Sequence, residues 1–197
     1  MKKKNRLLIL VGPRAIGKTF WIEKLTAYFG GLLQIVRNTT TRAPRHDRES
    51  RYYEFVDEQE FRFRLVRGWF LEHDQYPPNS PNQFFYGSSR QEIERVLEKT
   101  HGIVALTPRG AAALWEHRKE FPISIIVFRH VSEEVLVRNL ASRGMVDPDE
   151  VMKVLELARN YTVPTHVPHH VFPITLETAH DQDVLMDIVA PLILTPQ

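Results

Sequence analysis

A short apolar run that leads directly into a glycine- and lysine-containing loop constrains this chain more than any other feature. The run is Leu7–Val11, and the eight residues from Gly12 to Thr19 match the spacing G-x-x-x-x-G-K-[ST] in full. The glycines permit a tight turn whose backbone N–H groups can surround a phosphate, and a helix that starts at the end of the turn adds a favourable dipole. The sequence therefore predicts a buried strand, a phosphate-binding loop and a helix, in that order.

Two side chains of the loop have the chemistry needed for a nucleoside triphosphate. Lys18 can reach the β- and γ-phosphates, and the hydroxyl of Thr19 can ligate Mg²⁺. We therefore expect MgATP as the phosphoryl donor, with Mg²⁺ as the cofactor. Arg14 has two open interpretations, a further phosphate contact or a side chain that points to solvent. The expected ATP-binding residues are Gly12, Pro13, Arg14, Ala15, Ile16, Gly17, Lys18 and Thr19.

Strand-like and helix-like segments alternate along most of the chain, which is typical of a parallel sheet with helices on both faces. The expected core strands are Leu7–Val11, Leu32–Val36, Ile103–Leu106, Ile123–Phe128 and Val171–Ile174. The expected core helices are Lys18–Phe29, Arg109–Phe121 and about Asp181–Ile193. We predict an α/β fold of three layers, of the P-loop NTPase type, with a five-stranded parallel core sheet in one domain over residues 1–197.

Two segments depart from this alternation and predict additions to the core. Residues 33–99 mix strand and helix signals, and we expect them to form an inserted acceptor-binding subdomain. Residues 132–161 are expected to form a lid of two helices that is broken at Gly144. The elements expected in these segments are strands Tyr52–Val56 and Trp69–His73, helices Glu58–Arg67, Ser89–Lys99, Glu133–Arg143 and Pro148–Asn160, and loops Asn38–Ser50 and Tyr76–Gln83, the last rich in proline.

Composition limits the partners and the compartment. The hydrophobic fraction of 43% and the charged fraction of 25% are ordinary for a globular protein, and the net charge of +2 gives no reason to expect a nucleic acid or a membrane as partner. The chain has no cysteine, which fits a reducing compartment, and its apolar runs are too short to cross a membrane. We expect a cytoplasmic protein, either a monomer or a homodimer.

A polar, arginine-rich segment after the second core strand points to the acceptor of the phosphoryl group. Arg42 and Arg45 are three residues apart in the run Thr-Thr-Arg-Ala-Pro-Arg, a pattern that suits bidentate contacts to a dianionic phosphate. The phenol groups of Tyr53 and Tyr86 can donate hydrogen bonds to the same oxygens.

At these residues the sequence resembles the guanylate kinase family, whose acceptor site opens with T-T-R-x-P-R and continues with a Y-x-F strand. Further matches follow in the right order at residues 70–72 (Phe-Leu-Glu), 86–88 (Tyr-Gly-Ser), 110–111 (Gly-Ala) and 143–144 (Arg-Gly). The resemblance implies the reaction of MgATP with GMP to give ADP and GDP, a step of purine nucleotide metabolism. The GMP-binding residues that it implies are Asn38, Arg42, Arg45, Tyr53, Glu72, Tyr86 and Ser88. The catalytic residues that it implies are Lys18, Arg42, Arg138 and Arg143.

The chain departs from the family pattern in two places. The strand after the acceptor region usually ends in two aspartates spaced D-x-D, whereas this chain has Ala105, Leu106 and Thr107 there. The family lid carries three arginines that close over the transferring group. Arg143 matches one of these arginines. The position of the second is occupied by Asn139, with Arg138 next to it, and the position of the third is occupied by Val154.

Two other functions remain open at the level of sequence. A kinase of the same fold could act on another phosphorylated acceptor, such as ribose 1,5-bisphosphate, and the missing aspartates favour this interpretation. A guanylate kinase-like module could instead bind a partner without catalysis, but such modules commonly lose the loop lysine, whereas Lys18 is retained.

Overall fold

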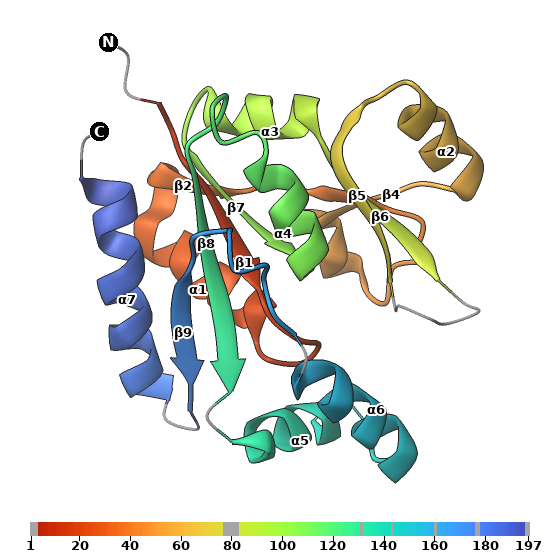
Figure 1. Ribbon diagram of the computed structural model, residues 1–197, viewed down its shortest axis with the longest axis vertical. Coiled ribbons are helices and arrows are strands. Elements are labelled where there is room, and N and C mark those ends of the chain that lie inside the picture. Colours follow the sequence, from red (N-terminus) through yellow and green to blue (C-terminus); the bar gives the residue numbers. More distant parts are fainter. Residues whose placement is uncertain are drawn as a thin grey trace.

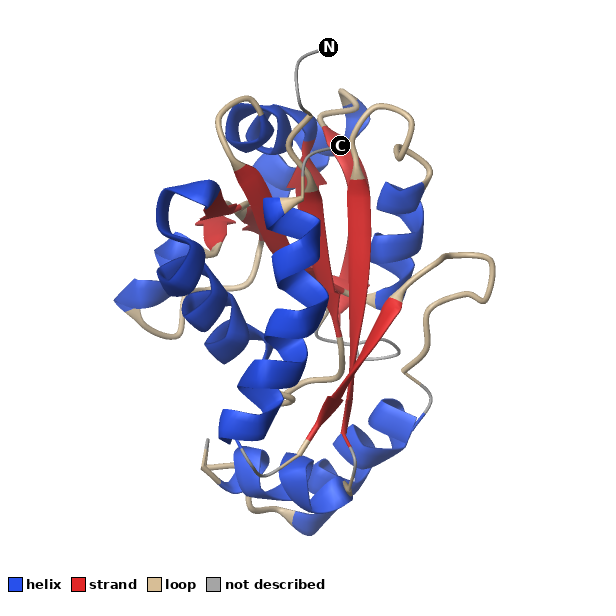
Figure 2. Ribbon diagram, turned by 90° about the vertical axis from the view of Figure 1, so that its left-hand side faces the viewer, coloured by secondary structure: helices blue, strands red, loops and turns tan. Residues whose placement is uncertain are grey.

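The computed structural model describes residues 4–76, 83–130, 132–142, 144–159, 161–175 and 178–195. In this part of the chain the strands form two sheets, flanked by helices (Figures 1 and 2). The strands are β1 (Leu7–Val11), β2 (Leu33–Ile35), β3 (Asn38–Thr40), β4 (Tyr53–Phe55), β5 (Phe70–Tyr76), β6 (Phe84–Ser89), β7 (His101–Leu106), β8 (Ile123–His130) and β9 (His170–Ile174). The α-helices are α1 (Lys18–Phe29), α2 (Glu58–Val66), α3 (Arg90–Leu97), α4 (Pro108–Trp115), α5 (Glu133–Ala141), α6 (Pro148–Arg159) and α7 (Thr178–Leu194).

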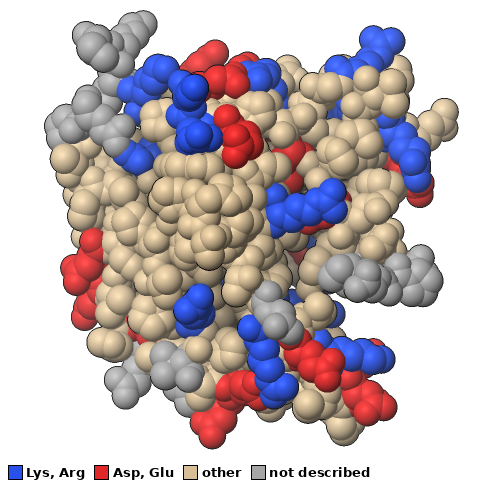
Figure 3. Space-filling view, viewed as in Figure 1, with Lys and Arg blue, Asp and Glu red and all other residues tan. Residues whose placement is uncertain are grey.

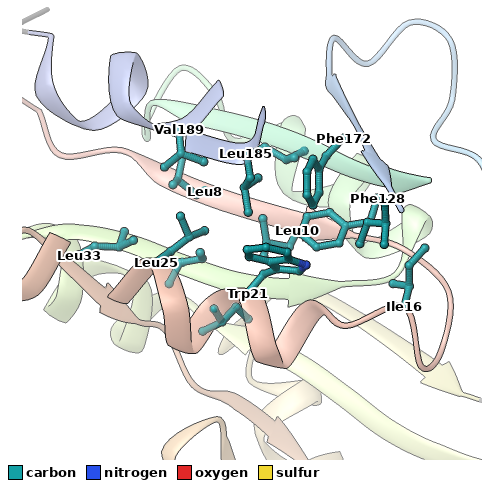
Figure 4. Packing of buried hydrophobic residues seen from close by; sticks show 14 of the residues in the cluster. Leu8, Leu10, Ile16, Trp21, Leu25, Leu33, Phe128, Phe172, Leu185 and Val189 are labelled. Carbon is teal, nitrogen blue, oxygen red and sulfur yellow. The ribbon is translucent and has the colours of Figure 1, made fainter. Parts of the chain in front are cut away.

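The core sheet is parallel, in the order β2-β7-β1-β8-β9. Every residue of β1 is buried, and alternate residues face opposite sides, as the twofold period of a strand requires. Leu8 and Leu10 pack with α1 and α7 on one face, as Figure 4 shows, whereas Leu7 and Ile9 pack with α3 and α4 on the other. These two apolar layers confirm the predicted three-layer fold with a five-stranded parallel core.

The second sheet contains four strands in the order β4-β3-β6-β5. β3 runs parallel to β4 and antiparallel to β6, and β6 runs antiparallel to β5. Helix α2 covers this sheet through Phe61, whose ring stacks on Phe70 at 4.6 Å between centroids and lies 5.2 Å from the ring of Phe85. All four strands lie between residues 38 and 89, whereas β2 belongs to the core sheet and α3 packs on it.

The sequence prediction was wrong for two strands of this sheet. Asn38–Thr40 was expected to be the start of a loop but forms β3, and no strand was expected at Phe84–Ser89, which forms β6. The buried hydroxyl of Thr40 donates a hydrogen bond to the carbonyl of Phe85, and Thr39 pairs with Gly87. β3 is short and polar, and β6 joins an aromatic run to Gly87 and two serines, so pairing with distant partners stabilises these strands rather than an apolar period of their own.

The predicted helices are confirmed with changes at their ends. Ser89 caps α3, because its side chain accepts a hydrogen bond from the Glu92 backbone N–H. Helix α4 ends at Trp115 instead of continuing to Phe121. The helix pair α5 and α6 is interrupted at Gly144, whose φ of 77° favours glycine. Residues 77–82, which make up most of the predicted proline-rich loop, lie outside the described residues. No helix in the described ranges is long and apolar enough to cross a membrane.

Candidate active site

The loop between β1 and α1 has the backbone shape of a phosphate cradle. Gly17 has φ 98° and precedes the first turn of α1, and Ala15 has φ 66°, so two residues of this turn are left-handed. The ammonium group of Lys18 donates hydrogen bonds to the carbonyl oxygens of Gly12 and Pro13, at 2.6 and 2.9 Å. The backbone N–H groups at the start of α1 face the same turn, so the loop can present several donors and one cation to a phosphate.

The helix pair α5–α6 is anchored on this loop. The side-chain amide of Asn139 donates a hydrogen bond of 2.9 Å to the carbonyl oxygen of Ala15. Ala15 also packs in a small buried cluster with Leu140 and Val154. Two positions where the family resemblance expects lid arginines are thus occupied by residues that fix the helix pair to the loop. Arg138 lies on α5 and is exposed, and Arg143 lies outside the described residues.

A buried carboxylate, Glu49, contacts both arginines that were predicted to bind the acceptor phosphate. Both terminal nitrogens of Arg42 donate to Glu49, at 3.0 Å to each oxygen, and the backbone N–H of Arg45 donates to the same group at 2.7 Å. Burial alone would raise the pKa of the Glu49 carboxyl, but the hydrogen bonds from Arg42 and Arg45 hold it below its ordinary value. Glu49 therefore stays ionised and fixes the Arg42 guanidinium, whereas the Arg45 side chain is exposed.

Two phenol rings lie beside this arginine. The guanidinium carbon of Arg42 is 5.3 Å from the ring centroid of Tyr53, and the rings of Tyr53 and Tyr86 are 6.2 Å apart. Burial raises the pKa of the Tyr53 hydroxyl, so this group remains a hydrogen-bond donor at neutral pH. The structure thus brings together three of the four residues expected to hold the acceptor phosphate.

On the same sheet, where Asn38 pairs with Tyr53 and Glu72 pairs with Ser88, the side chains of Glu72, Ser88 and Asn38 form a buried polar chain. The Ser88 hydroxyl is 2.5 Å from a Glu72 oxygen and 2.9 Å from the side-chain oxygen of Asn38. The amide nitrogen of Asn38 donates to the carbonyl oxygen of Ala105 at 3.2 Å, which fixes which end of the amide faces Ser88. The three residues that were expected to contact the acceptor base are therefore in direct contact.

The hydrogen-bond chain determines where the protons lie in this pocket. A serine hydroxyl has one proton and cannot donate to both Glu72 and Asn38. Both contacts are hydrogen bonds at once when Glu72 is protonated and donates to Ser88. Burial raises the pKa of Glu72 to about 7, the hydrogen bond from Ser88 opposes this rise, and repulsion from Asp74 adds to it. The carboxyl therefore changes its charge near neutral pH.

One residue of the loop and two of the predicted acceptor-binding residues line the same cleft. Thr19, at the start of α1, lines a cleft together with Asn38, Tyr53 and Ala105. Figure 3 shows the corresponding face hollowed between the second sheet and the helix pair α5–α6. A donor phosphate on the loop and an acceptor on the second sheet would meet in this cleft, at the carboxyl ends of the parallel strands where ligands of such folds bind.

The family model described as guanylate kinase matches residues 4–166. The chain belongs to the guanylate kinase family. A guanylate kinase of Symbiobacterium thermophilum is 30% identical over 156 residues, which cover 78% of this chain and 70% of that protein. A guanylate kinase of Leifsonia xyli subsp. xyli is 28% identical over 200 residues, with 100% and 76% covered. Family membership confirms the predicted enzyme class, a nucleoside-monophosphate kinase.

Solved structures show the same fold. The crystal structure of guanylate kinase from Anaplasma phagocytophilum gives a TM-score of 0.65 at 20% identity and covers 98% of this chain and 89% of that one. A gluconokinase from Sinorhizobium meliloti gives a TM-score of 0.51 at 14% identity, with 98% and 95% covered. At these identities the likeness shows the P-loop fold and no more.

Within this guanylate kinase-type site, sequence reasoning missed several residues. No role was predicted for Glu49 from the sequence, although an acid within such a basic segment is a signal for a buried ion pair. Gly110 leaves room for the Glu72 carboxylate, because a Cβ atom at position 110 would lie 2.7 Å from one of its oxygens. Asp74 and Thr107 are hydrogen-bonded to each other across 33 residues of sequence, a contact that no local pattern indicates.

Proposed function

We propose that this protein transfers the γ-phosphoryl group of ATP to GMP and produces ADP and GDP. The observation that carries the proposal is the placement of Glu72, a buried carboxylate that is linked through Ser88 to Asn38, which lines the cleft together with Tyr53. Ionised Glu72 can accept hydrogen bonds from N1 and the 2-amino group of guanine. Adenine presents an acceptor at N1 and has no 2-amino group, so it would leave the buried carboxylate without the donors that guanine supplies, at a cost of about 1 to 3 kcal/mol.

In-line phosphoryl transfer needs positioning and charge neutralisation rather than a covalent intermediate. The loop residues 12–19 would hold the donor phosphates, with Lys18 moving from its loop carbonyls to the β- and γ-phosphates. Arg42, Arg45, Tyr53 and Tyr86 would hold the acceptor phosphate and aim one oxygen at the γ-phosphorus. Because Glu49 fixes Arg42 before the substrate arrives, little reorganisation is needed at that contact.

The donor set around Thr19 fits Mg²⁺ that is bound mainly through the nucleotide. Mg²⁺ commonly keeps several waters and needs only one or two protein oxygens beside substrate phosphates. Thr19 has an exposed hydroxyl in the first turn of α1, and no cluster of metal-ligating side chains occurs in the described ranges. The metal would neutralise charge on the β- and γ-phosphate oxygens, and Thr19 would be its protein ligand.

Closure over the substrates is part of this proposal. We assign acceptor binding to the part of the predicted range 33–99 that forms the second sheet and α2, and we assign residues 132–161 as the lid. Arg138 is exposed on α5, and it would approach the transferring group together with Arg143 when the lid closes over the cleft. Closure would exclude water, which otherwise competes as an acceptor.

One observation favours a second candidate, a kinase for another phosphorylated acceptor such as ribose 1,5-bisphosphate. The end of β7 carries Ala105, Leu106 and Thr107, with no carboxylate. A sugar acceptor would make no use of Glu72 as a base contact, so this candidate predicts little effect of Glu72→Gln.

An ADP-release assay over GMP, dGMP, AMP, UMP and ribose phosphates tests the choice. We expect turnover that depends on GMP, is abolished by Lys18→Ala and is strongly weakened by Glu72→Gln. Equal rates with AMP and GMP would refute the guanine assignment. ATP binding without turnover of any acceptor would instead indicate a binding module.

A further inference from the structure

A second carboxylate, Asp74, lies near Glu72 on β5. Both are on β5, two residues apart, and therefore point to the same face of the sheet. Glu72 is paired with Ser88 of β6 and Asp74 with Tyr86, so the two acids lie next to the two β6 residues that face the proposed substrate. The Asp74 side chain is only 13% exposed.

The Asp74 carboxylate is held against the end of β7. One of its oxygens accepts a hydrogen bond of 2.6 Å from the Thr107 hydroxyl, and the other accepts from the Gln75 backbone N–H at 2.9 Å. Thr107 caps α4, because its hydroxyl also accepts from the Gly110 N–H at 3.0 Å. The hydroxyl proton of Thr107 is therefore committed to Asp74, and the N-terminus of α4 favours the negative charge.

The Asp74 carboxylate can accept more hydrogen bonds than the protein donates to it. Each carboxylate oxygen can accept about two hydrogen bonds, and each oxygen of Asp74 has one strong donor. The charged groups that face it are Glu72, which repels it, and Arg109, whose side chain is 79% exposed and lies 3.7 Å away. Two acids that share a pocket repel each other, so a ligand that brings N–H donors would relieve this cost.

We propose that Asp74 is a second specificity-determining residue, which accepts a hydrogen bond from the exocyclic 2-amino group of the acceptor base. This inference rests on the proposed function, since it assumes a guanine acceptor. Glu72 takes the ring N1–H and one hydrogen of the amino group, and Asp74 takes the other hydrogen. The end of β7 has no carboxylate of its own, and Asp74 of β5 brings one to it through the hydrogen bond from Thr107.

Binding of GMP and IMP to the full-length protein tests this assignment, because IMP differs from GMP only by lacking the 2-amino group. Isothermal titration gives Kd for both nucleotides with wild type and Asp74→Ala. We expect Asp74→Ala to raise the Kd of GMP about 10- to 100-fold, the loss typical of a hydrogen bond to a charged group, and to change the Kd of IMP less than about threefold. Glu58→Gln, which removes an exposed charge on α2, is the matched control and should change neither value.

A purely structural role for Asp74 would weaken GMP and IMP by the same factor, and that result overturns the inference. If Asp74→Ala does not fold, Asp74→Asn keeps the shape and removes the charge, and it must still lower the preference for GMP over IMP. Wild-type protein that does not phosphorylate GMP would refute the proposed function and this inference together. Turnover of GMP with an unchanged GMP preference in the variants would refute the inference alone.

Discussion

The ionisation of Glu72 makes acceptor binding depend on pH in a defined direction. The carboxyl is buried and its pKa is raised to about 7, so below neutral pH it is protonated and donates to Ser88. To accept hydrogen bonds from a guanine edge through both oxygens it must be ionised. GMP binding therefore competes with protonation, and the KM for GMP is expected to rise as the pH falls.

The expected size follows from the pKa. With a free-enzyme value of about 7, lowering the pH from 8 to 6 leaves roughly one molecule in ten ionised, which raises the KM for GMP about tenfold. The second ionisation of a phosphate monoester, near pH 6, contributes as well. The phosphate ionisation affects wild type and Glu72→Gln equally, but the variant lacks the titrating carboxyl. The ratio of the two KM values at each pH therefore reports the ionisation of Glu72 alone.

The same pKa predicts a change in stability. The folded-state pKa lies above the ordinary value of 4.5, so the contribution of Glu72 to stability is fully present below about pH 4.5 and is lost as the pH rises through 7. A shift of this size corresponds to about 3 kcal/mol, at about 1.4 kcal/mol per pH unit. Relative to wild type, the unfolding free energy of Glu72→Gln should therefore rise by about this amount between pH 4.5 and 8.

Two assays check these expectations. Steady-state kinetics at saturating MgATP between pH 6 and 8.5 give the KM for GMP of wild type and Glu72→Gln, and urea unfolding over pH 4.5 to 8 gives their stabilities. Parallel KM profiles together with a constant stability difference would refute the reasoning, because they would show that Glu72 does not titrate in this range.

Three further substitutions test other parts of the site. Glu49→Gln should lower the unfolding free energy by about 3 kcal/mol, because it leaves the buried Arg42 guanidinium without its anionic partner, and it should also raise the KM for GMP. Urea unfolding that matches the wild type would contradict this. Gly110→Ala should lower the Tm and raise the KM for GMP, because the new Cβ would displace the Glu72 side chain. Helix propensity alone would raise the Tm, so a higher Tm would contradict this expectation. Lys18→Ala should lower kcat by about 100-fold or more with the Tm unchanged, and retained turnover would show that the lysine does not act on the phosphates.

The predictable parts of the fold are those fixed by local sequence. β1, the loop and α1 were placed at the observed bounds, because an apolar strand, a glycine turn and a helical period lie in consecutive residues. β3 and β6 were missed, because β3 has three polar residues, β6 has no regular apolar alternation, and the two strands pair across 46 residues at Thr40 and Tyr86. Pairing at this distance leaves no local periodic signal.

The candidate site divides in the same way. The Arg42 and Glu72 positions were recognisable from short motifs, whereas their partners were not. Asp74 lies on β5 and Thr107 caps α4, so the two residues meet only in the folded protein. The sequence alone therefore did not indicate that an acid on β5 lies beside the end of β7, which has none. Asn139 and Val154 looked like lost arginines, but the structure shows them joined to the phosphate loop.

The most direct test of phosphoryl transfer between the two halves of the cleft uses ATP labelled in the γ-phosphate. Incubation with unlabelled GMP and Mg²⁺, followed by separation of the nucleotides, shows where the label goes. Transfer between the loop at Lys18 and the acceptor site at Arg42 and Glu72 predicts label in GDP and little in inorganic phosphate. Label that stays in ATP, or that appears only in inorganic phosphate or in another acceptor, would contradict it.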